Sequence, residues 1–381
     1  MTVLYFPLTP PARDHAALRA EVRDFLKTAL PAGYSAADRA RSWSGFDAEF
    51  SRALGAQGYI GMTLPREYGG QERSAIERHV VVEELLAAGA PVAAHWIADR
   101  QSAPMILHNG TEAQKRAILP RIAAGECYFC IGMSEPDSGS DLASVRMKAE
   151  RTDQGWRLNG TKLWTTYAHE SHYMICFCRT GPSGATSGDR HGGTSQFLID
   201  LTLPGITIQP VLDIAGEHHF NEVNFDNVVL PADALLGNEG DGWAQVMAEL
   251  SFERSGPERF LSSFALLDDA IRVAPQTDAS AAVTGRLLAH MLVLRHMSQS
   301  IAARLARGER PDLHAAIVKD LGAVYEQDIP ERLREILGPD QSDDAYAATY
   351  ARIRQAAPGF SLRGGTREVL RGIIARGLGL R

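Results

Sequence analysis

The stretch of sequence that decides the fold is CYFCIGMSEPDSGSDLASVRMKAERTDQGWRLNGTKLWTTYA, residues 127–168. It opens with an apolar run, Tyr128 to Met133, which has the length of a buried strand. Polar residues follow from Glu135 to Asp141, where Pro136 presets one backbone angle and Gly139 permits another that a side chain disfavours. The sequence therefore predicts a strand followed by a tight turn.

This turn has the composition of an anion-binding loop. Successive backbone N–H groups, together with the hydroxyls of Ser138 and Ser140, can form a concave nest for a phosphate. An ordinary Ser/Gly loop is the alternative, and composition alone favours it because the loop contains no lysine. For Trp164, further along, the alternative to a binding role is a core aromatic residue.

The order of the short motifs around the turn is more specific than any one of them. The chain reads Ser134-Glu-Pro, then Gly139-Ser-Asp, then an Asn159-Gly160 pair that we expect to form a turn, then Lys162-Leu-Trp-Thr-Thr. Together these motifs resemble the acyl-CoA dehydrogenase family. The resemblance implies that the chain is a flavoprotein oxidoreductase with FAD as its cofactor.

The resemblance also assigns roles to residues in this stretch. It implies that Ile131, Met133 and Ser134 face one side of the flavin ring, and that Trp164 and Thr166 cover the other side. It further implies that Ser140, next to the cofactor-binding Gly139, lies between the flavin pyrophosphate and the acyl-CoA substrate.

Composition narrows the class of protein. With 381 residues, of which 45% are hydrophobic, the chain is long enough for two or three domains with substantial cores. A formal net charge of −7 argues against a nucleic-acid partner. The sequence has no apolar run long enough to span a bilayer and no signal pattern at its start, so we expect no membrane insertion and a cytoplasmic location.

The cysteines and paired histidines do not suggest a metal site. Cys127-x-x-Cys130 lies in an apolar strand, and no second pair follows at zinc-site spacing. Cys176 and Cys178 would share one face of a strand, as small core residues do, whereas the adjacent residues His218 and His219 would point to opposite faces. We expect all four cysteines to be packing residues.

Hydrophobic periodicity divides the chain into three parts. Residues 1–125 have helical spacing, with helices expected over 14–29, 46–57 and 74–88 and after 111, the last two beginning at capping boxes. Residues 126–235 have strand spacing, which predicts a β-barrel or sandwich with a mobile hairpin loop over 181–194. Residues 236–381 return to long helices, expected over 244–271, 279–306, 313–337 and 343–356, with Pro257 and Pro330 kinking or breaking theirs.

This order is the architecture of the acyl-CoA dehydrogenase family. We therefore expect an α+β fold with an N-terminal all-helical domain (1–125), a middle β-barrel domain (126–235) and a C-terminal domain of the four-helix-bundle type (236–381).

Dehydrogenation of an acyl thioester requires a carboxylate that removes the α proton. Many family members supply it as a glutamate near the C-terminus, but the matching position here is Gly364. Other members, including branched-chain, long-chain and some steroid side-chain dehydrogenases, place a Glu before an Arg on the first helix of the C-terminal bundle. The pair Glu253-Arg254 matches that position, so the resemblance implies that Glu253 is the base and that Arg254 supports the CoA-binding region. The alternative for both is an exposed helix charge.

The loop near the C-terminus still has roles under the resemblance. The N–H of Gly364 would bind the thioester carbonyl, and Thr366 and Glu368 match positions near the flavin. Glu368 also stands at a predicted helix start, where a carboxylate is favourable for structural reasons alone.

Two family motifs that hold the adenosine half of FAD from a neighbouring subunit, Arg-x-x-Phe-Gly and Gln-x-x-Gly-Gly, are not found. After Arg272 the chain reads Val-Ala-Pro-Gln, and residues 338–346 read GPDQSDDAY. One explanation is a homo-oligomer, dimer or tetramer, with a divergent adenine site. The other is a heterotetramer in which a related chain supplies the missing contacts.

The leading expectation is an FAD-dependent acyl-CoA dehydrogenase that forms a trans-2-enoyl-CoA and passes electrons to an electron-transfer flavoprotein. The position of Glu253 favours a branched, long or bulky acyl group, with a role in fatty acid or steroid side-chain catabolism. The alternatives are a flavin-dependent monooxygenase or oxidase of the same fold, and a subunit that needs a partner chain for FAD binding.

Overall fold

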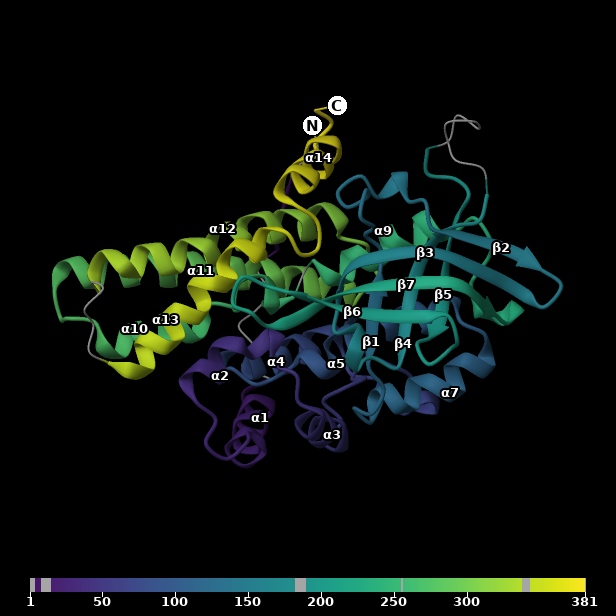
Figure 1. The fold of residues 1–381 in the computed structure, drawn as a ribbon. Helices are drawn as coiled ribbons and strands as arrows, with labels where there is room; N and C mark the ends of the chain where they lie inside the picture. Colours follow the sequence, from purple (N-terminus) through teal and green to yellow (C-terminus); the bar gives the residue numbers. More distant parts are fainter. Residues whose placement is uncertain (1–3, 8–14, 182–189, 255, 338–342, 381) are drawn as a thin grey trace. The chain divides into compact units, whose positions relative to one another are not determined.

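The computed structural model describes residues 4–7, 15–181, 190–254, 256–337 and 343–380, without the side chains of 250–253 (Figure 1). These residues group into two compact units. The helical unit comprises Met1–Ala53, Arg73–Ala93 and Leu250–Arg381, and the sheet unit comprises Leu54–Glu72 and Ala94–Glu249.

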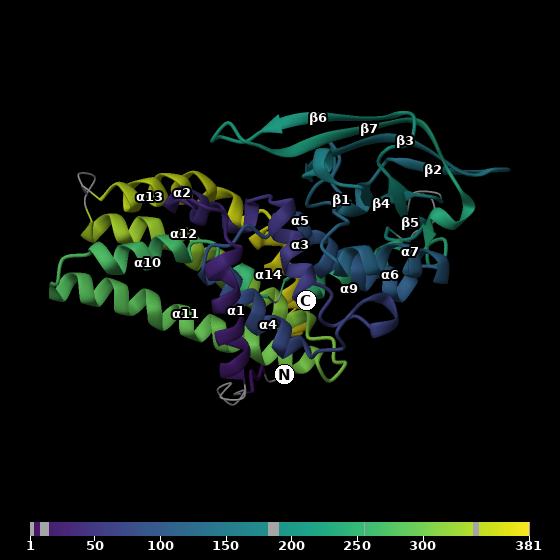
Figure 2. The ribbon, with the colours of Figure 1, turned by 90° about the horizontal axis from the view of Figure 1, so that it is seen from below.

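The helical unit contains the long helices of the chain. α11 and α12 contact each other along their length, and α10 packs against α12 and α13 (Figures 1 and 2). The helices of this unit are α1 (Ala16–Ala29), α2 (Ala36–Arg41), α4 (Ala75–Ala87), α10 (Phe264–Val273), α11 (Asp278–Leu305), α12 (Asp312–Ile336), α13 (Asp344–Ala356) and α14 (Arg367–Gly377).

Local signals placed several helix ends correctly. The predicted capping box of α4 is present, because the Ser74 side chain accepts from the Glu77 N–H while the Glu77 side chain accepts from the Ser74 N–H. α4 gives way to Gly89, whose φ of 73° is left-handed, as expected of a helix stop. The first long C-terminal helix is broken as predicted, into α9 (Gly242–Glu253), a short 3-10 helix that begins at Pro257, and α10. Pro330 does not break α12, which continues to Ile336.

A buried carboxylate joins three helices of this unit. Glu83 on α4 accepts from Arg19 Nη2 of α1 at 2.5 Å and from Arg295 Nε of α11 at 2.6 Å. His79 Nε2 lies 3.7 Å from the same carboxylate. Burial acts to raise the pKa of Glu83, but the hydrogen bond from Arg295 and the nearby His79 side chain outweigh burial and hold that pKa well below its usual range.

The sheet unit is built on one eight-stranded sheet with the order β6-β7-β3-β2-β4-β5-β8, in which β1 pairs in parallel with β4 (Figure 2). Its strands are β1 (Phe129–Gly132), β2 (Lys148–Thr152), β3 (Gly155–Thr166), β4 (Tyr173–Arg179), β5 (Thr194–Asp200), β6 (Ile206–Leu212), β7 (His218–Leu230) and β8 (Leu235–Leu236). Its helices include α5 (Ala93–Ile97), α6 (Ala103–Asn109) and α7 (Glu112–Ala123); α3 (Ala48–Ala56) begins in the helical unit and ends here. Of the predicted loop over 181–194, residues 182–189 lie outside the described residues.

The prediction of a turn at Asn159-Gly160 is wrong. Both residues lie within β3, which is one long strand where the sequence suggested two. Gly160 has a φ of 145° and sits at a register shift against β7, and a Cβ there would lie 2.9 Å from the Met147 Cβ. Gly160 is therefore required by a β-bulge and by the close approach of Met147. Both features favour glycine, as a turn does, and this is why the sequence suggested a turn.

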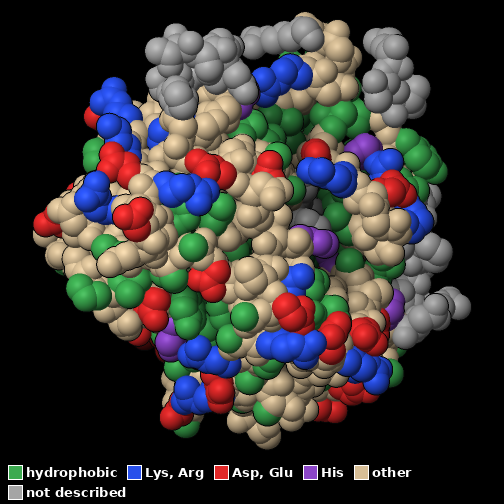
Figure 3. All heavy atoms as spheres, turned by 90° about the vertical axis from the view of Figure 1, so that its right-hand side faces the viewer, with side chains coloured by type: hydrophobic (Ala, Val, Ile, Leu, Met, Phe, Trp, Pro, Cys, Tyr) green, Lys and Arg blue, Asp and Glu red, His purple; other side chains and the backbone are tan. Residues whose placement is uncertain are grey.

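The face drawn in Figure 3 shows basic and acidic side chains interspersed among its described residues. The net negative charge is therefore not gathered into one patch on that face. Among the described residues, no helix is both long and apolar enough to cross a membrane.

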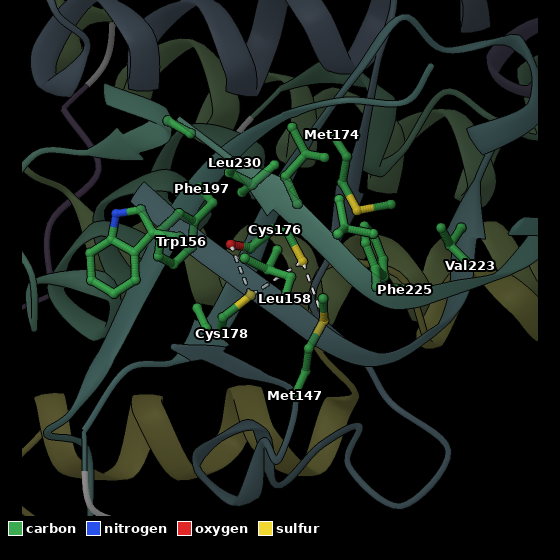
Figure 4. Packing of buried hydrophobic residues seen from close by; sticks show 14 of the residues in the cluster. Met147, Trp156, Leu158, Met174, Cys176, Cys178, Phe197, Val223, Phe225 and Leu230 are labelled. Carbon is green, nitrogen blue, oxygen red and sulfur yellow. Dashed lines mark hydrogen bonds between the residues drawn. The ribbon is translucent and has the colours of Figure 1, made fainter. Parts of the chain in front are cut away.

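The core of the sheet unit is rich in sulfur. Cys176, Cys178 and Met147 lie together in one cluster with Trp156 and Leu158, and the two cysteine Sγ atoms are 3.6 Å apart (Figure 4). All four cysteines are free and buried, as expected of packing residues.

Candidate active site

In the sheet unit, the end of β1 is fixed to the end of β3. The Leu163 N–H donates to the carbonyl oxygen of Ser134 at 2.9 Å. This bond brings Ile131, Met133 and Ser134, all partly exposed, close to the segment that carries Trp164 and Thr166. The end of β1 and the end of β3 thus lie side by side, and the roles predicted for these residues at a flavin stay predictions.

Trp164 is not a core residue. The register of β3 against β7 shifts between Lys162 and Thr165, and Trp164 has a left-handed φ of 60° within the shift. Its side chain is 56% exposed and meets Phe220 edge-on, with ring centroids 5.8 Å apart. A left-handed backbone is costly for a bulky residue, and such strain is most often retained where a site needs it.

The turn after β1 is narrower than expected. The Glu135 N–H donates to Ser138 O at 2.7 Å and the Ser138 N–H donates back to Glu135 O at 3.1 Å, so Pro136 and Asp137 form its centre. Gly139 does not have a positive φ, and a side chain at this position would meet no neighbouring atom. The prediction that Gly139 adopts a backbone angle disfavoured by a side chain is therefore wrong. The Ser138 hydroxyl donates to the Asp141 carbonyl at 2.9 Å and so is engaged within its own loop. Ser140 is exposed.

Sequence reasoning missed a buried ion pair behind this turn. Lys162 is fully buried on β3, and its Nζ donates to Glu135 Oε1 at 2.8 Å and to the Met133 carbonyl oxygen at 3.1 Å. The local sequence does not distinguish this buried lysine from one that points to solvent, because its partners lie 27 and 29 positions away.

In the helical unit, the end of α9 is tied to the loop before α14. Arg254, 5% exposed, donates from Nε to the carbonyl oxygen of Gly364 at 2.9 Å. Gly364 and Gly365 have φ values of 70° and 97°, which a side chain would strain. Glu253 is the last residue of α9, and its side chain lies outside the described residues.

Thr366 and Glu368 begin α14. The Thr366 side chain caps the helix by accepting from the Val369 N–H. Hydrogen bonds from its own N–H and from the Thr366 hydroxyl lower the pKa of Glu368, which is exposed. A structural role at the helix start is therefore established for both residues, and a role near a flavin stays a prediction.

The region of the two missing motifs is engaged in local contacts. Arg272 on α10 donates to Asp269 at 3.1 Å and to Asp343 at 3.4 Å. Residues 338–342 lie outside the described part of the chain. Among the described residues, no group of three or more His, Cys, Asp or Glu side chains is placed to hold a metal ion.

Three domain models of one family match the chain in succession. They describe the acyl-CoA dehydrogenase N-terminal domain (residues 12–126), middle domain (130–228) and C-terminal domain (240–379). The chain is 34% identical over 393 residues to acyl-CoA dehydrogenase IpdE1 of Mycobacterium tuberculosis, covering 97% of this chain and 98% of that protein. Against two other relatives from that organism, the chain spans 40% and 62% of their length.

Solved structures agree with the family models. The chain matches the steroid ACAD Tcur3481-Tcur3483 with a TM-score of 0.86 and 26% identity, covering 98% of this chain and 99% of that chain. It matches a chain of the ChsE4-ChsE5 complex from Mycobacterium tuberculosis with a TM-score of 0.83 and 29% identity, covering 100% and 99%. The motif order around residues 134–166, the helix–sheet–helix architecture and these matches agree, and the chain belongs to the acyl-CoA dehydrogenase family of flavoprotein oxidoreductases.

Proposed function

We propose that the chain is an FAD-dependent acyl-CoA dehydrogenase with Glu253 as the base that removes the α proton. One observation carries the proposal: Arg254 bonds to the carbonyl oxygen of Gly364. The residue next to Glu253 is thereby held at the loop where many family members place their base, and where this chain has only a glycine. A carboxylate at the end of α9 would act at that same loop.

The residues at the ends of β1 and β3, Ser134, Trp164 and Thr166, fit a flavin ring. The exposed indole of Trp164 supplies a flat apolar surface, and Ser134 and Thr166 supply hydroxyl and backbone groups at the same place. A large exposed aromatic residue on a strained backbone is characteristic of a binding surface. FAD, when bound there, would accept the hydride from the β carbon of the substrate.

The residues of the chain divide the remaining work. Glu253 takes the α proton. When the bound substrate covers the end of α9, burial raises the pKa of the Glu253 carboxyl and makes the carboxylate a stronger base. The N–H of Gly364 binds the thioester carbonyl oxygen and stabilises the negative charge that develops on it. Arg254 holds the Gly364 peptide in place, and Ser140 contacts the cofactor and the acyl-CoA.

The relatives that match over nearly their full length support a bulky acyl group and an assembly of two related chains. One is described as a steroid ACAD, and another is a two-component complex. We therefore favour a heteromeric assembly in which a partner supplies the FAD contacts that this chain lacks. An electron-transfer flavoprotein is the proposed electron acceptor.

The test is anaerobic reduction of the flavin by a panel of straight, branched and steroid-type acyl-CoAs, using wild type, Glu253→Gln and Glu335→Gln. Glu335 is a half-exposed carboxylate on α12, paired with Arg332, and serves as the matched control. We expect Glu253→Gln to retain flavin but to lose flavin bleaching, and Glu335→Gln to behave as wild type. Near-normal bleaching by Glu253→Gln would remove Glu253 as the base.

The same preparations distinguish the other functions. Fast reoxidation of the bleached flavin by air would favour an oxidase or monooxygenase. A chain that is colourless alone and yellow only with a related chain would identify a subunit that depends on its partner for FAD.

A further inference from the structure

The Lys162–Glu135 pair lies directly behind the proposed flavin surface. Lys162 has no exposed surface, and both of its hydrogen bonds end on the three residues that follow β1, at Met133 O and at Glu135 Oε1. Burying an ammonium group is costly, and a buried pair is weak evidence for a stabilising role. Its position therefore requires another explanation.

Glu135 is held rigidly. Besides Lys162, its carboxylate accepts from the Arg146 N–H at 2.7 Å and from the Met147 N–H at 3.0 Å. Its backbone forms both hydrogen bonds of the turn with Ser138. The ammonium of Lys162 therefore lies between a fixed carboxylate and the end of β1.

The chain also makes room for the lysine stem. A Cβ at Gly132 would lie 3.2 Å from Lys162 Cγ and 2.6 Å from Met174 Sδ, so only glycine fits over the stem. The lysine, its acceptor Met133 and the glycine above it form one packed arrangement at the end of β1.

The Met133 carbonyl belongs to the same peptide group as the Ser134 N–H. A cation on the carbonyl oxygen draws electron density from the peptide and makes its N–H a stronger donor. The other side of Ser134 is fixed by the bond from Leu163 N–H to Ser134 O. That bond holds the next peptide group, Ser134–Glu135, so the polarised Met133–Ser134 peptide is held at its carbonyl oxygen and is followed by a second fixed peptide.

We propose that Lys162 is a positioning residue that tunes the bound flavin through the Met133–Ser134 peptide group. The buried ammonium orients this peptide and strengthens the hydrogen bond from the Ser134 N–H to the flavin ring. A stronger donor favours the electron-rich reduced flavin over the oxidised form. This inference rests on the proposed flavin site.

The experiment measures the midpoint potential of the bound flavin in the reconstituted holoenzyme, with the partner chain if FAD binding needs one. In Lys162→Met/Glu135→Gln both charges are removed together. We expect reduced flavin to bind about tenfold more weakly relative to oxidised flavin, which corresponds to a potential about 30 mV more negative for a two-electron couple. Glu135→Gln alone keeps the ammonium without its counter-charge, and its potential should shift in the positive direction.

Arg179→Met is the matched control. Arg179 is also a buried cation of this unit, and it donates to the carbonyl oxygens of Ala143 and Gly192, each at 2.8 Å, but not to Met133. We expect it to lower thermal stability and leave the potential unchanged. An equal potential shift in Arg179→Met, or no shift in Glu135→Gln, would overturn the inference.

The two proposals fail in different ways. If wild type binds no FAD in any assembly, the proposed function is wrong. If wild type binds FAD and all variants share its potential, the proposed function stands and the role of Lys162 is only structural. If the double variant does not fold, the sign of the shift in Glu135→Gln decides.

Discussion

Arg254 and Gly364 lie 110 residues apart in the sequence, yet Arg254 Nε donates to the Gly364 carbonyl oxygen at 2.9 Å. The bond joins the end of α9 to a loop of two consecutive left-handed glycines. The proposed base, Glu253, directly precedes Arg254. This bond therefore fixes the position of the backbone that carries the base.

Replacing Arg254 tests that link. Arg254→Gln removes a charged donor from the partly buried Gly364 carbonyl, a loss of about 1.5–3 kcal/mol, which predicts a fall in kcat/KM of about 10- to 100-fold. Steady-state kinetics with the best acyl-CoA provide the measurement. Arg272→Gln, on the exposed side of α10, is the control and should keep wild-type kinetics. Unchanged kcat/KM in Arg254→Gln would separate this arginine from the reaction.

Gly364 and Gly372 should respond to alanine with opposite signs. Gly364→Ala forces a side chain into a left-handed conformation and should cost about 1–2 kcal/mol. Gly372 lies inside α14 with open space around it, so Gly372→Ala should stabilise by about 0.5–1 kcal/mol. Thermal unfolding of both variants checks the pair of signs, and a stabilised Gly364→Ala would contradict the left-handed loop.

Trp164 should report flavin binding directly. All five tryptophans lie in the described residues, and Trp164 is the only one of the five that is exposed. Trp164→Ala removes ring stacking and should weaken FAD affinity roughly two- to tenfold, measured by titration of the flavin-free protein. Trp243→Phe, whose indole stacks on His191, is the control and should retain the affinity. Equal affinity in all three proteins would place the flavin away from Trp164.

Glu83 should contribute a pH dependence to the stability of the helical unit. Its pKa is lower in the folded chain than in the unfolded chain, so its contribution is complete above the unfolded value, about 4.3, and is lost as pH falls toward the folded value. Glu83→Gln should cost about 1–3 kcal/mol at pH 7, since Arg19 and Arg295 lose a charged acceptor.

The measurement is the Tm of wild type and Glu83→Gln between pH 3 and pH 7. Their difference should narrow below about pH 5, where the wild-type contribution fades. Glu335→Gln should follow the wild-type curve at every pH. If the Tm difference between wild type and Glu83→Gln stays constant down to pH 3, Glu83 is not the source of the pH dependence of stability.

Predictions that depend on local chemistry succeeded. The capping boxes at Ser74 and Thr111 are present, because capping involves only residues within one turn. The strands predicted within residues 126–235 are also present, since β1 to β7 lie between Phe129 and Leu230. The family resemblance is likewise confirmed, because its motifs keep a fixed order.

Predictions that depend on partners distant in the sequence failed. Gly160 is a glycine because Met147, the residue before β2, comes close, and no local pattern reveals this approach. Lys162 belongs to the Lys162-Leu-Trp-Thr-Thr motif, but the sequence did not predict its buried ion pair. Its partners Glu135 and Met133 lie almost 30 residues away. The roles of Ile131, Ser140 and Glu253 stay predictions.

The four buried cysteines allow the opening of the sheet unit to be followed by thiol labelling. All of them lie between residues 127 and 178, within the sheet unit, and burial raises the pKa of the Cys127 thiol to about 11. Because all four thiols are buried, a thiol reagent added to the folded protein does not reach them until that unit opens. The rate of labelling would time the opening of the sheet alone, while the helical unit, which has no cysteine, stays silent.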